Sequence, residues 1–366
     1  MFALEYFQHN LFHKHETSSK DILNICCNIM TEMNHDLLDW VKSEGDNLGF
    51  KDITSAVKLR EQASLRQYFR IFTDAGTYIG VVGSPNSDEN QLFHTNAKYL
   101  RSNDVQVPDV MALNHEKGFL IVQDFGDLLL QDLIGKNEDD FLYKEALSSL
   151  IKIQSCKPEP NLSHINIENL IAQMHLFEEW FLNALLRIDF RNQYNLISKG
   201  IQHIADECSK QTRKVCHFDY EFRNLMLLSN EAIGVLDFQD LCVGPYGIDL
   251  VAIIKDIDNP LSKKKSIEYS EFFLAESHKV KNLREINIET LLRDIDYAGF
   301  QRQLRILGTL SRLHLRDKKS FRLQDLPQTL RYLISGMDRY DPLKEFSKFL
   351  ETVVQPCLFE ILEDLE

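Results

Sequence analysis

Four polar residues within one stretch of the chain have the types and spacing that phosphoryl transfer requires. His217, Asp219 and Asn224 form an H-x-D-x-x-x-x-N pattern, and Asp237 follows a short apolar run eighteen residues after Asp219. A carboxylate at Asp219 can orient an attacking hydroxyl and accept its proton as the catalytic base. Asn224 and Asp237 supply the hard oxygen ligands that suit Mg²⁺. Each piece alone is common, but together they favour a magnesium-dependent phosphotransferase.

Three neighbouring residues have a structural and a functional interpretation. His217 is favoured as a side chain that hydrogen-bonds backbone near the metal-binding strand, with proton shuttling as the alternative. Arg223 could contact phosphate or brace the loop through a salt bridge. Asp249 is expected to cap the next helix or brace the loop rather than take part in the chemistry.

Upstream of this stretch, the pattern predicts a small β-rich lobe. The first predicted element is a hairpin, in which an aromatic-rich run at Ser64–Phe72 is joined by a turn to a second apolar run at Thr77–Val82. Helical periodicity covers Leu92–Leu100, and a second hairpin is expected between Val110–Leu113 and Phe119–Gln123.

Downstream, apolar residues recur at helical spacing, with one short β-rich interruption at Val215–Asp237. The expected fold class is therefore α+β and bilobal. The small β-rich lobe spans 33–125, the larger helical lobe that contains Asp219, Asn224 and Asp237 spans 126–366, and residues 1–32 are an extension with no assigned function. The clearest helical segments are Leu128–Ile134, Asp140–Gln154, Ile167–Ile188 and Leu196–Gln211.

Composition narrows the classes of partner. The formal charge of −14 disfavours binding to nucleic acid or anionic membranes. No apolar run is long enough to span a bilayer, and no signal peptide is evident, which predicts a cytoplasmic protein. The seven cysteines lack metal-like spacing, and Cys216 and Cys242 are expected to be buried thiols.

The chain resembles the aminoglycoside phosphotransferase superfamily, which has a protein-kinase-like fold. Within it, the chain is similar to the bacterial anomeric kinases of N-acetylmuramic acid and N-acetylglucosamine that act in cell-wall (peptidoglycan) recycling. Four segments carry the resemblance, which runs from about Met33 to Tyr340: Ala63–Arg70, Asp219–Met226, Gly234–Asp240 with Gly244-Pro and Asp249-Leu, and Gln301–Gly308 with the segments that follow it.

The resemblance implies that residues 33–125 form a nucleotide-binding lobe and that residues 126–366 carry catalysis and the acceptor site. It also implies a reaction. ATP would lie between the lobes under the turn that begins at Ser64, with Arg66 also at the nucleotide and the adenine near the connection formed by Gln123, Asp124 and Phe125. With Mg²⁺ held by the two ligands named above, the phosphoryl group would pass to the anomeric hydroxyl of an amino sugar, giving a sugar 1-phosphate.

The chain departs from the general kinase pattern in its first hairpin. It has no glycine-rich G-x-G-x-x-G, and the strand Thr77–Val82 has no lysine to bind phosphate. Arg66 or Arg70 could compensate, although Arg70 could equally be a surface strand residue. Phe218 stands where an arginine or glycine commonly precedes the catalytic aspartate, which argues against control by phosphorylation.

Three further residues are candidates for the acceptor site. Gln239 and Asp240 follow the metal-binding aspartate closely enough to meet a bound sugar. Glu179 belongs to Met174–Phe181, which resembles a family segment beside the acceptor; the favoured interpretation of this segment is an amphipathic helix with buried aromatic residues and solvated glutamates.

Other functions remain open at this point. A kinase of the same fold could act on an aminoglycoside, choline-like or homoserine acceptor, and the acidic composition would suit a cationic one. A nucleotide-binding pseudokinase would be expected to lack one of the three catalytic residues, all of which are present. A purely structural helical protein would leave their spacing unexplained.

Overall fold

The structure is a computed structural model that describes residues 34–59, 66–135 and 139–365. It divides into two compact units: the chain up to Thr95 with Pro108–Asp124 forms unit 1, and Asn96–Val107 with Phe125–Glu366 forms unit 2. The expected extension 1–32 lies outside the described residues, and so does Ser64.

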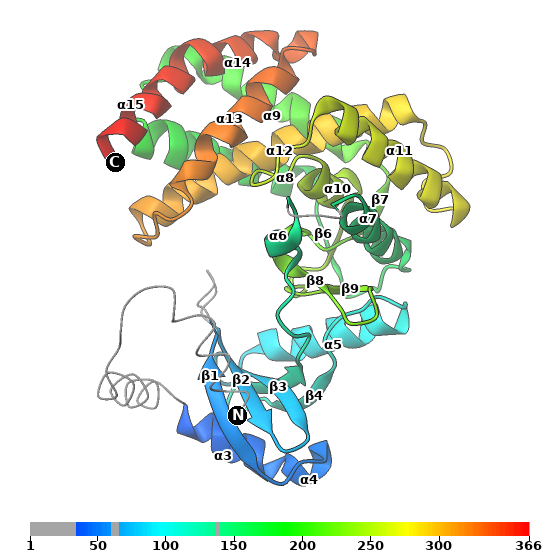
Figure 1. Cartoon of the computed structure of the whole chain (residues 1–366). Coiled ribbons are helices and arrows are strands. Elements are labelled where there is room, and N and C mark those ends of the chain that lie inside the picture. The colour runs from blue at the N-terminus through cyan, green and yellow to red at the C-terminus, as the bar shows by residue number, and fades with distance from the viewer. Residues whose placement is uncertain (1–33, 60–65, 136–138, 366) are drawn as a thin grey trace. The chain divides into compact units, whose positions relative to one another are not determined.

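Unit 1 is built on a five-stranded antiparallel sheet in the order β1-β2-β3-β5-β4 (Figure 1). Both predicted hairpins are confirmed, because β2 pairs with β3 and β4 pairs with β5. Thr73 and Gly76 close the first hairpin, and Gly76 has a φ of 142°, which favours glycine. The strands are β1 Ile53–Lys58, β2 Gln67–Thr73, β3 Gly76–Val82, β4 Val110–Asn114 and β5 Phe119–Gln123.

A short N-terminal helix covers one face of this sheet. Helix α3, His35–Ser43, is capped by Asn34, whose side chain accepts the N–H of Leu37. Trp40 of α3 packs against Phe119 of β5 with ring centroids 5.8 Å apart. Helix α4, Gly45–Leu48, follows directly, and helix α5, Asp88–Ser102, begins in unit 1 and ends in unit 2.

Short strands at the centre of unit 2 carry the predicted β-rich interruption. Strand β7, Arg213–Cys216, pairs antiparallel with β10, Cys242–Pro245, and β10 also pairs with β6, Ser163–His164. Strands β8, Leu225–Leu227, and β9, Ile233–Val235, form a separate antiparallel hairpin.

Helices make up the rest of unit 2 and pack around the long helix α12 (Figure 1). Gly308 of α12 lies so close to the backbone of Leu176 that a Cβ would come within 2.2 Å of it. The helices are α6 Leu130–Leu133, α7 Asp139–Ser155, α8 Ile167–Leu176, α9 Tyr194–Ser209, α10 Gly247–Ile254, α11 Lys263–Lys279, α12 Ile288–Leu315, α13 Leu326–Met337, α14 Lys344–Phe349 and α15 Gln355–Leu365.

The expected helix at Ile167–Ile188 changes type within its length. Helix α8 continues as a π-helix over Phe177–Leu185. Phe177 and Phe181 are buried, as expected, but the expectation that the glutamates are solvated is wrong for Glu178. Glu178 is buried and pairs with His175, whereas Glu179 is exposed. The widened helical turn shifts the side chains out of the simple 3.6-residue pattern on which the expectation rested.

Two other expectations can be compared with the structure. Cys216 and Cys242 are buried free thiols, as expected, and burial raises the pKa of Cys242 to about 12. Within the described residues, no helix is long and apolar enough to cross a membrane.

Candidate active site

The β8–β9 hairpin brings the two predicted metal ligands side by side. Its register pairs Leu225 with Val235, and one residue further on the N–H of Leu236 donates to the carbonyl of Asn224 at 2.8 Å. Asn224 precedes β8 and lies opposite Leu236, so the antiparallel pairing places Asp237 one position beyond the direct partner of Asn224. The eighteen positions between Asp219 and Asp237 are thus accounted for by the rest of the loop and the β8–β9 hairpin.

Asp249 holds the start of the 217–224 loop through two backbone hydrogen bonds. Its Oδ2 accepts the N–H of His217 at 2.6 Å, and its Oδ1 accepts the N–H of Phe218 at 2.8 Å. Phe218 has a φ of 77°, a conformation that is costly for a bulky side chain and persists only where the surroundings impose it. Both oxygens of one fully buried carboxylate are therefore used to fix the turn that precedes Asp219.

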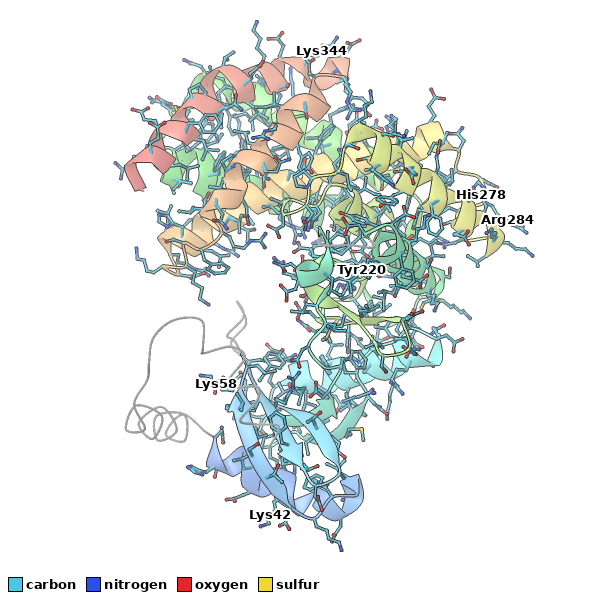
Figure 2. All side chains as sticks on the ribbon, viewed as in Figure 1. Lys42, Lys58, Tyr220, His278, Arg284 and Lys344 are labelled. Carbon is cyan, nitrogen blue, oxygen red and sulfur yellow. The ribbon has the colours of Figure 1, made fainter. Side chains whose placement is uncertain are left out.

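His217 has both ring nitrogens engaged by backbone. Nε2 lies 2.8 Å from the carbonyl of Leu236, and Nδ1 accepts the N–H of Asp219 at 3.3 Å. This arrangement requires the neutral ring with its proton on Nε2. The His217 side chain is fully buried. The nearby Tyr220, labelled in Figure 2, donates a hydrogen bond from its hydroxyl group to the carbonyl of Ala146 at 2.8 Å. His217 thus ties the loop to the strand that leads to Asp237.

The carboxylate of Asp219 faces two arginines without a tight contact to either. Arg223 Nη2 lies 3.4 Å from Oδ2, and Arg305 Nη2 lies 3.6 Å from Oδ1. Charge-assisted hydrogen bonds normally measure about 2.7–2.9 Å. The Asp219 side chain remains 33% exposed, so its oxygens stay open to a further hydrogen-bond donor.

The same positive charges set the protonation state of Asp219. Burial acts to raise the pKa of this carboxyl, but the charges of Arg305, Arg223 and Arg302 outweigh burial and lower it. Asp219 is therefore ionised at neutral pH, and both of its oxygens can accept hydrogen bonds.

Glu221 explains why Arg223 makes no tight contact with Asp219. Arg223 Nη2 lies 2.6 Å from Glu221 Oε2, and Arg302 Nη2 pairs with Glu221 Oε1. Arg223 and Arg302 thus have their short ion pairs with Glu221, two residues away from Asp219. Glu221 therefore keeps these two arginines near Asp219 without a tight contact between them and the Asp219 carboxylate.

Arg305 reaches the site from helix α12 and lies over an aromatic ring. Its Cζ is 4.8 Å from the centroid of the Phe218 ring. Burial lowers the pKa of the guanidinium, yet an arginine remains charged in the physiological range. Phe218 therefore serves as a platform that positions a cation beside Asp219.

The donor atoms of Asn224 and Asp237 fit a magnesium ion. Asn224 Nδ2 donates to the carbonyl of Asp219 at 2.9 Å, which leaves its Oδ1 for another partner. Asp237 Oδ1 accepts from Gln239 Nε2 at 2.6 Å, and its Oδ2 has no hydrogen bond to any residue that the structure describes. Mg²⁺ prefers hard oxygen ligands and keeps several of its waters, so it needs few protein side chains. Asp237 has a φ of 60°, a further strained conformation at this site.

The segment after Asp237 is anchored by helix α5. Asn96 Nδ2 donates to the carbonyls of Phe238 and Gln239 at 3.1 and 3.3 Å. The Oε1 of Gln239 is buried without a hydrogen-bond partner among the described residues. Asp240 is exposed as a whole residue, but its carboxyl group is partly removed from water, and this desolvation together with the charges of Asp237 and Asp219 raises its pKa. Two of the three predicted acceptor residues, Gln239 and Asp240, therefore lie next to Asp237.

The predicted nucleotide residues of unit 1 form ion pairs within that unit. Arg70 is buried and makes a two-pronged contact with Asp124, with Nε 2.7 Å from Oδ2 and Nη2 3.1 Å from Oδ1. The alternative that Arg70 is a surface strand residue is therefore wrong. Arg66 is also buried, 3.9 Å from Glu89 of α5, and its guanidinium lies over Phe93.

The connection at Gln123–Phe125 is fixed at both ends. Gln123 Oε1 accepts the N–H of Asp109 at 3.4 Å in unit 1. In unit 2, the ring of Phe125 packs so closely on Gly234 of β9 that a Cβ there would come within 2.6 Å of it. Gly234 is thus required where the aromatic ring meets the β8–β9 hairpin.

Three residues of the site had no role in the sequence-based prediction. Glu221, Arg302 and Arg305 surround Asp219, and the two arginines lie 81 and 86 positions from Glu221 and Asp219 in the chain. The sequence does indicate that Arg302 and Arg305 share one helix face, because they are three residues apart. Nothing in the sequence indicated which element that face would meet.

Comparisons with known proteins agree with this geometry. The model of a family described as the phosphotransferase enzyme family matches residues 55–283. An N-acetylmuramate/N-acetylglucosamine kinase of Pseudomonas putida is 29% identical over 290 residues, which cover 79% of this chain and 85% of that protein. A protein of the same name from Neisseria meningitidis is 27% identical over 329 residues, covering 87% and 95%.

A solved structure shows the fold. The ADP-bound aminoglycoside phosphotransferase APH(2'')-Ib superposes with a TM-score of 0.58 at 12% sequence identity, covering 82% of this chain and 98% of its own. At that identity the likeness extends to the fold, which is the predicted α+β, protein-kinase-like class.

Proposed function

We propose that this chain, which belongs to the phosphotransferase enzyme family, transfers a phosphoryl group from ATP to the anomeric hydroxyl of N-acetylmuramic acid or N-acetylglucosamine. The product would be the sugar 1-phosphate, and the reaction would serve peptidoglycan recycling in the cytoplasm. The single observation that supports this acceptor is the name shared by relatives that align over most of the chain. The arrangement of Asp219, Asn224 and Asp237 supports the reaction type.

Asp219 is proposed as the base that receives the acceptor. Its two contacts with arginines are longer than charge-assisted hydrogen bonds, so a sugar hydroxyl can donate to it without first displacing a tight ion pair. Lowering of its pKa keeps the carboxylate ionised at neutral pH. Hydrogen bonding to the substrate orients the hydroxyl oxygen, and the carboxylate accepts the proton as the phosphoryl group is transferred.

Arg305 and Arg223 are proposed to stabilise negative charge beside the base. Both guanidinium groups lie within 4 Å of Asp219. Arg223 also forms a shorter ion pair with Glu221. Positive groups that are already positioned contribute to transition-state stabilisation without reorganisation during the reaction. Glu221 and Phe218 are the residues that hold them in place.

Asn224 and Asp237 are proposed to hold Mg²⁺ through Oδ1 and Oδ2, respectively. When bound, the ion would neutralise charge on the phosphates of the nucleotide. Gln239 fixes the orientation of the Asp237 carboxylate through its hydrogen bond to Oδ1. Asp249 and His217 fix the two backbone segments that carry these ligands.

ATP consumption in the presence of Mg²⁺ tests the acceptor. The panel is N-acetylmuramic acid, N-acetylglucosamine, choline, homoserine and kanamycin, each assayed with the Asp219→Asn variant as the matched control. Turnover with the N-acetyl sugars that is lost in the variant would support the proposal. Turnover only with an amine-bearing acceptor would retain the catalytic residues and refute the sugar assignment. No turnover with any acceptor would favour a nucleotide-binding pseudokinase.

A further inference from the structure

Unit 2 contains a cavity that is separate from the proposed catalytic site. Its volume is about 180 Å³, and it lies where the end of helix α7, the start of strand β7 and the turn after helix α11 meet. Figure 2 labels His278 and Arg284, which flank that turn in the sequence. Strand β7 leads from the cavity to His217 and spans roughly 13 Å at ~3.3 Å per residue. The cavity is therefore at the opposite end of β7 from Asp219.

Three cationic side chains line this cavity without a carboxylate partner. Arg213, Lys214 and Lys281 contribute to its wall. Arg213 Nη2 donates to the carbonyls of Ile165 and Val243, both at 2.6 Å, and within the described ranges none of the three forms a salt bridge. Three unpaired positive charges in one wall are notable in a chain whose formal charge is −14. Lys214 is half-buried, and this burial lowers the pKa of its ammonium group.

Two buried amide side chains in the same wall have unsatisfied polar atoms. Asn282 is only 7% exposed, and neither its Nδ2 nor its Oδ1 has a hydrogen-bond partner among the residues described. Gln154 is 1% exposed; its Nε2 donates to the carbonyl of Tyr246, but its Oε1 has no such partner. An unmade hydrogen bond of this kind costs about 1–3 kcal/mol, so buried polar groups normally have a partner.

The helix ends near the cavity do not neutralise it. Helices α7 and α11 end at Ser155 and Lys279, close in sequence to the residues that line the wall. A helix C-terminus carries roughly half a negative charge, so two such ends offset about one of the three full positive charges. The remaining excess is positive and favours an anion.

We infer that this cavity binds a small molecule that carries a phosphate group. Lys214, Lys281 and the free nitrogens of Arg213 would contact the phosphate oxygens, and the amide of Asn282 would donate a further hydrogen bond. The volume corresponds to roughly six water molecules at ~30 Å³ each, which exceeds what a phosphate group alone would fill. An organic phosphate therefore fits better than the inorganic ion.

Titration with two probes, followed by NMR, tests this inference on the full chain. Inorganic phosphate and glucose 1-phosphate are added at constant ionic strength with chloride as the balancing anion, because surface charges are screened by salt. The reporter is the side-chain amide signal of Asn282, assigned by its disappearance in Asn282→Asp. Saturable shifts at Asn282, with tighter binding of glucose 1-phosphate than of inorganic phosphate, are the expected result.

Variants separate this cavity from the nucleotide site. Lys214→Gln and Lys281→Gln should each weaken binding by roughly tenfold, since each removes a charged hydrogen-bond donor. Lys279→Gln is the matched control: this lysine is 68% exposed, pairs with Glu276 and does not line the cavity, so binding should be unchanged. Equal affinity for both probes would overturn the preference for an organic phosphate. No saturable shift at Asn282, or shifts confined to the Asn224 amide, would overturn the inference while leaving the proposed kinase activity untouched.

Discussion

Arg305 Nη2 lies 3.6 Å from Asp219 Oδ1, close enough to act through charge but too far to form a charge-assisted hydrogen bond. The two residues belong to a long helix and a loop that are 86 positions apart in the chain. This separation leaves the carboxylate ionised and also leaves its oxygen available.

Replacing Arg305 by Gln should raise the pKa of Asp219. Burial already acts to raise it, and the charge of Arg305 is the largest influence that opposes burial. Carbon-detected NMR of the Asp219 carboxyl in metal-free protein would show titration at higher pH in the variant. Arg293→Gln is the control, because Arg293 is on the same helix but pairs with Glu207. An unchanged titration in Arg305→Gln would refute the electrostatic role given to Arg305.

Replacing Asp237 by Asn should weaken nucleotide binding only when magnesium is present. The substitution retains an oxygen that can accept from Gln239 but removes the negative charge that the ion requires. Calorimetry would show that the variant binds ATP roughly tenfold or more weakly than the wild type when Mg²⁺ is present, and equally well when Mg²⁺ is absent. Asp132→Asn, an exposed carboxylate elsewhere in unit 2, is the control. Equal weakening in the absence of the ion would indicate that Asp237 is not a metal ligand.

Asp249 should give the protein a stability that falls as pH rises through the acidic range. Burial raises the pKa of this carboxyl to about 6, above its value in an unfolded chain. Between about pH 4 and pH 6 the folded state therefore holds a proton that the unfolded state has released, so rising pH favours unfolding. Urea denaturation across this range should show that Asp249→Asn lacks this contribution. If the free energy of unfolding changed with pH in the same way in the wild type and in Asp249→Asn, the contribution of Asp249 would be refuted.

Replacing Gly234 by Ala should destabilise the β8–β9 hairpin. The added Cβ would lie within 2.6 Å of the Phe125 ring, and overpacking of this kind costs about 1–3 kcal/mol. Gly244→Ala is the matched strand control, because its Cβ would meet Cys216 Sγ at an ordinary 3.5 Å. Equal melting temperatures for the two variants would show that Phe125 gives way without cost.

Local patterns were sufficient to predict the hairpins of unit 1 and most helices of unit 2. The apolar runs flanking Gly76 have the alternation and turn chemistry of a hairpin, and β2 and β3 pair accordingly. The α7 helix, predicted over Asp140–Gln154, extends one residue further at each end. These features depend on residues near in sequence, so the signal is contained in the segment itself.

Contacts between distant segments were not predictable in the same way. The ion pairs of Arg302 and Arg305 with loop carboxylates depend on how α12 packs, which helical periodicity does not determine. Arg70 was ambiguous because an arginine in a strand is usually exposed, and only the partner Asp124, 54 positions away, explains its burial. The π-helix at Phe177–Leu185 was hidden because its apolar spacing resembles that of an α-helix.

The residues expected to bind nucleotide and acceptor stay predictions. Gln123, Asp124 and Phe125 form a well-anchored connection, but its contact with adenine is a proposal. Gln239 and Asp240 lie beside the candidate metal ligands, and Glu179 is exposed on its π-helix. Substitution of each in the acceptor assay would separate effects on KM for ATP from effects on KM for the sugar.

Phosphorus NMR of the product formed from Mg-ATP and an N-acetyl amino sugar is the most direct test of the proposed reaction. We expect a phosphate coupled to the anomeric proton of the sugar, formed by the wild type and reduced about 10²–10⁴-fold or more in Asp219→Asn, which should still bind ATP. A phosphate on another hydroxyl would contradict the anomeric assignment. Near-normal turnover by Asp219→Asn would contradict the assignment of Asp219 as the base.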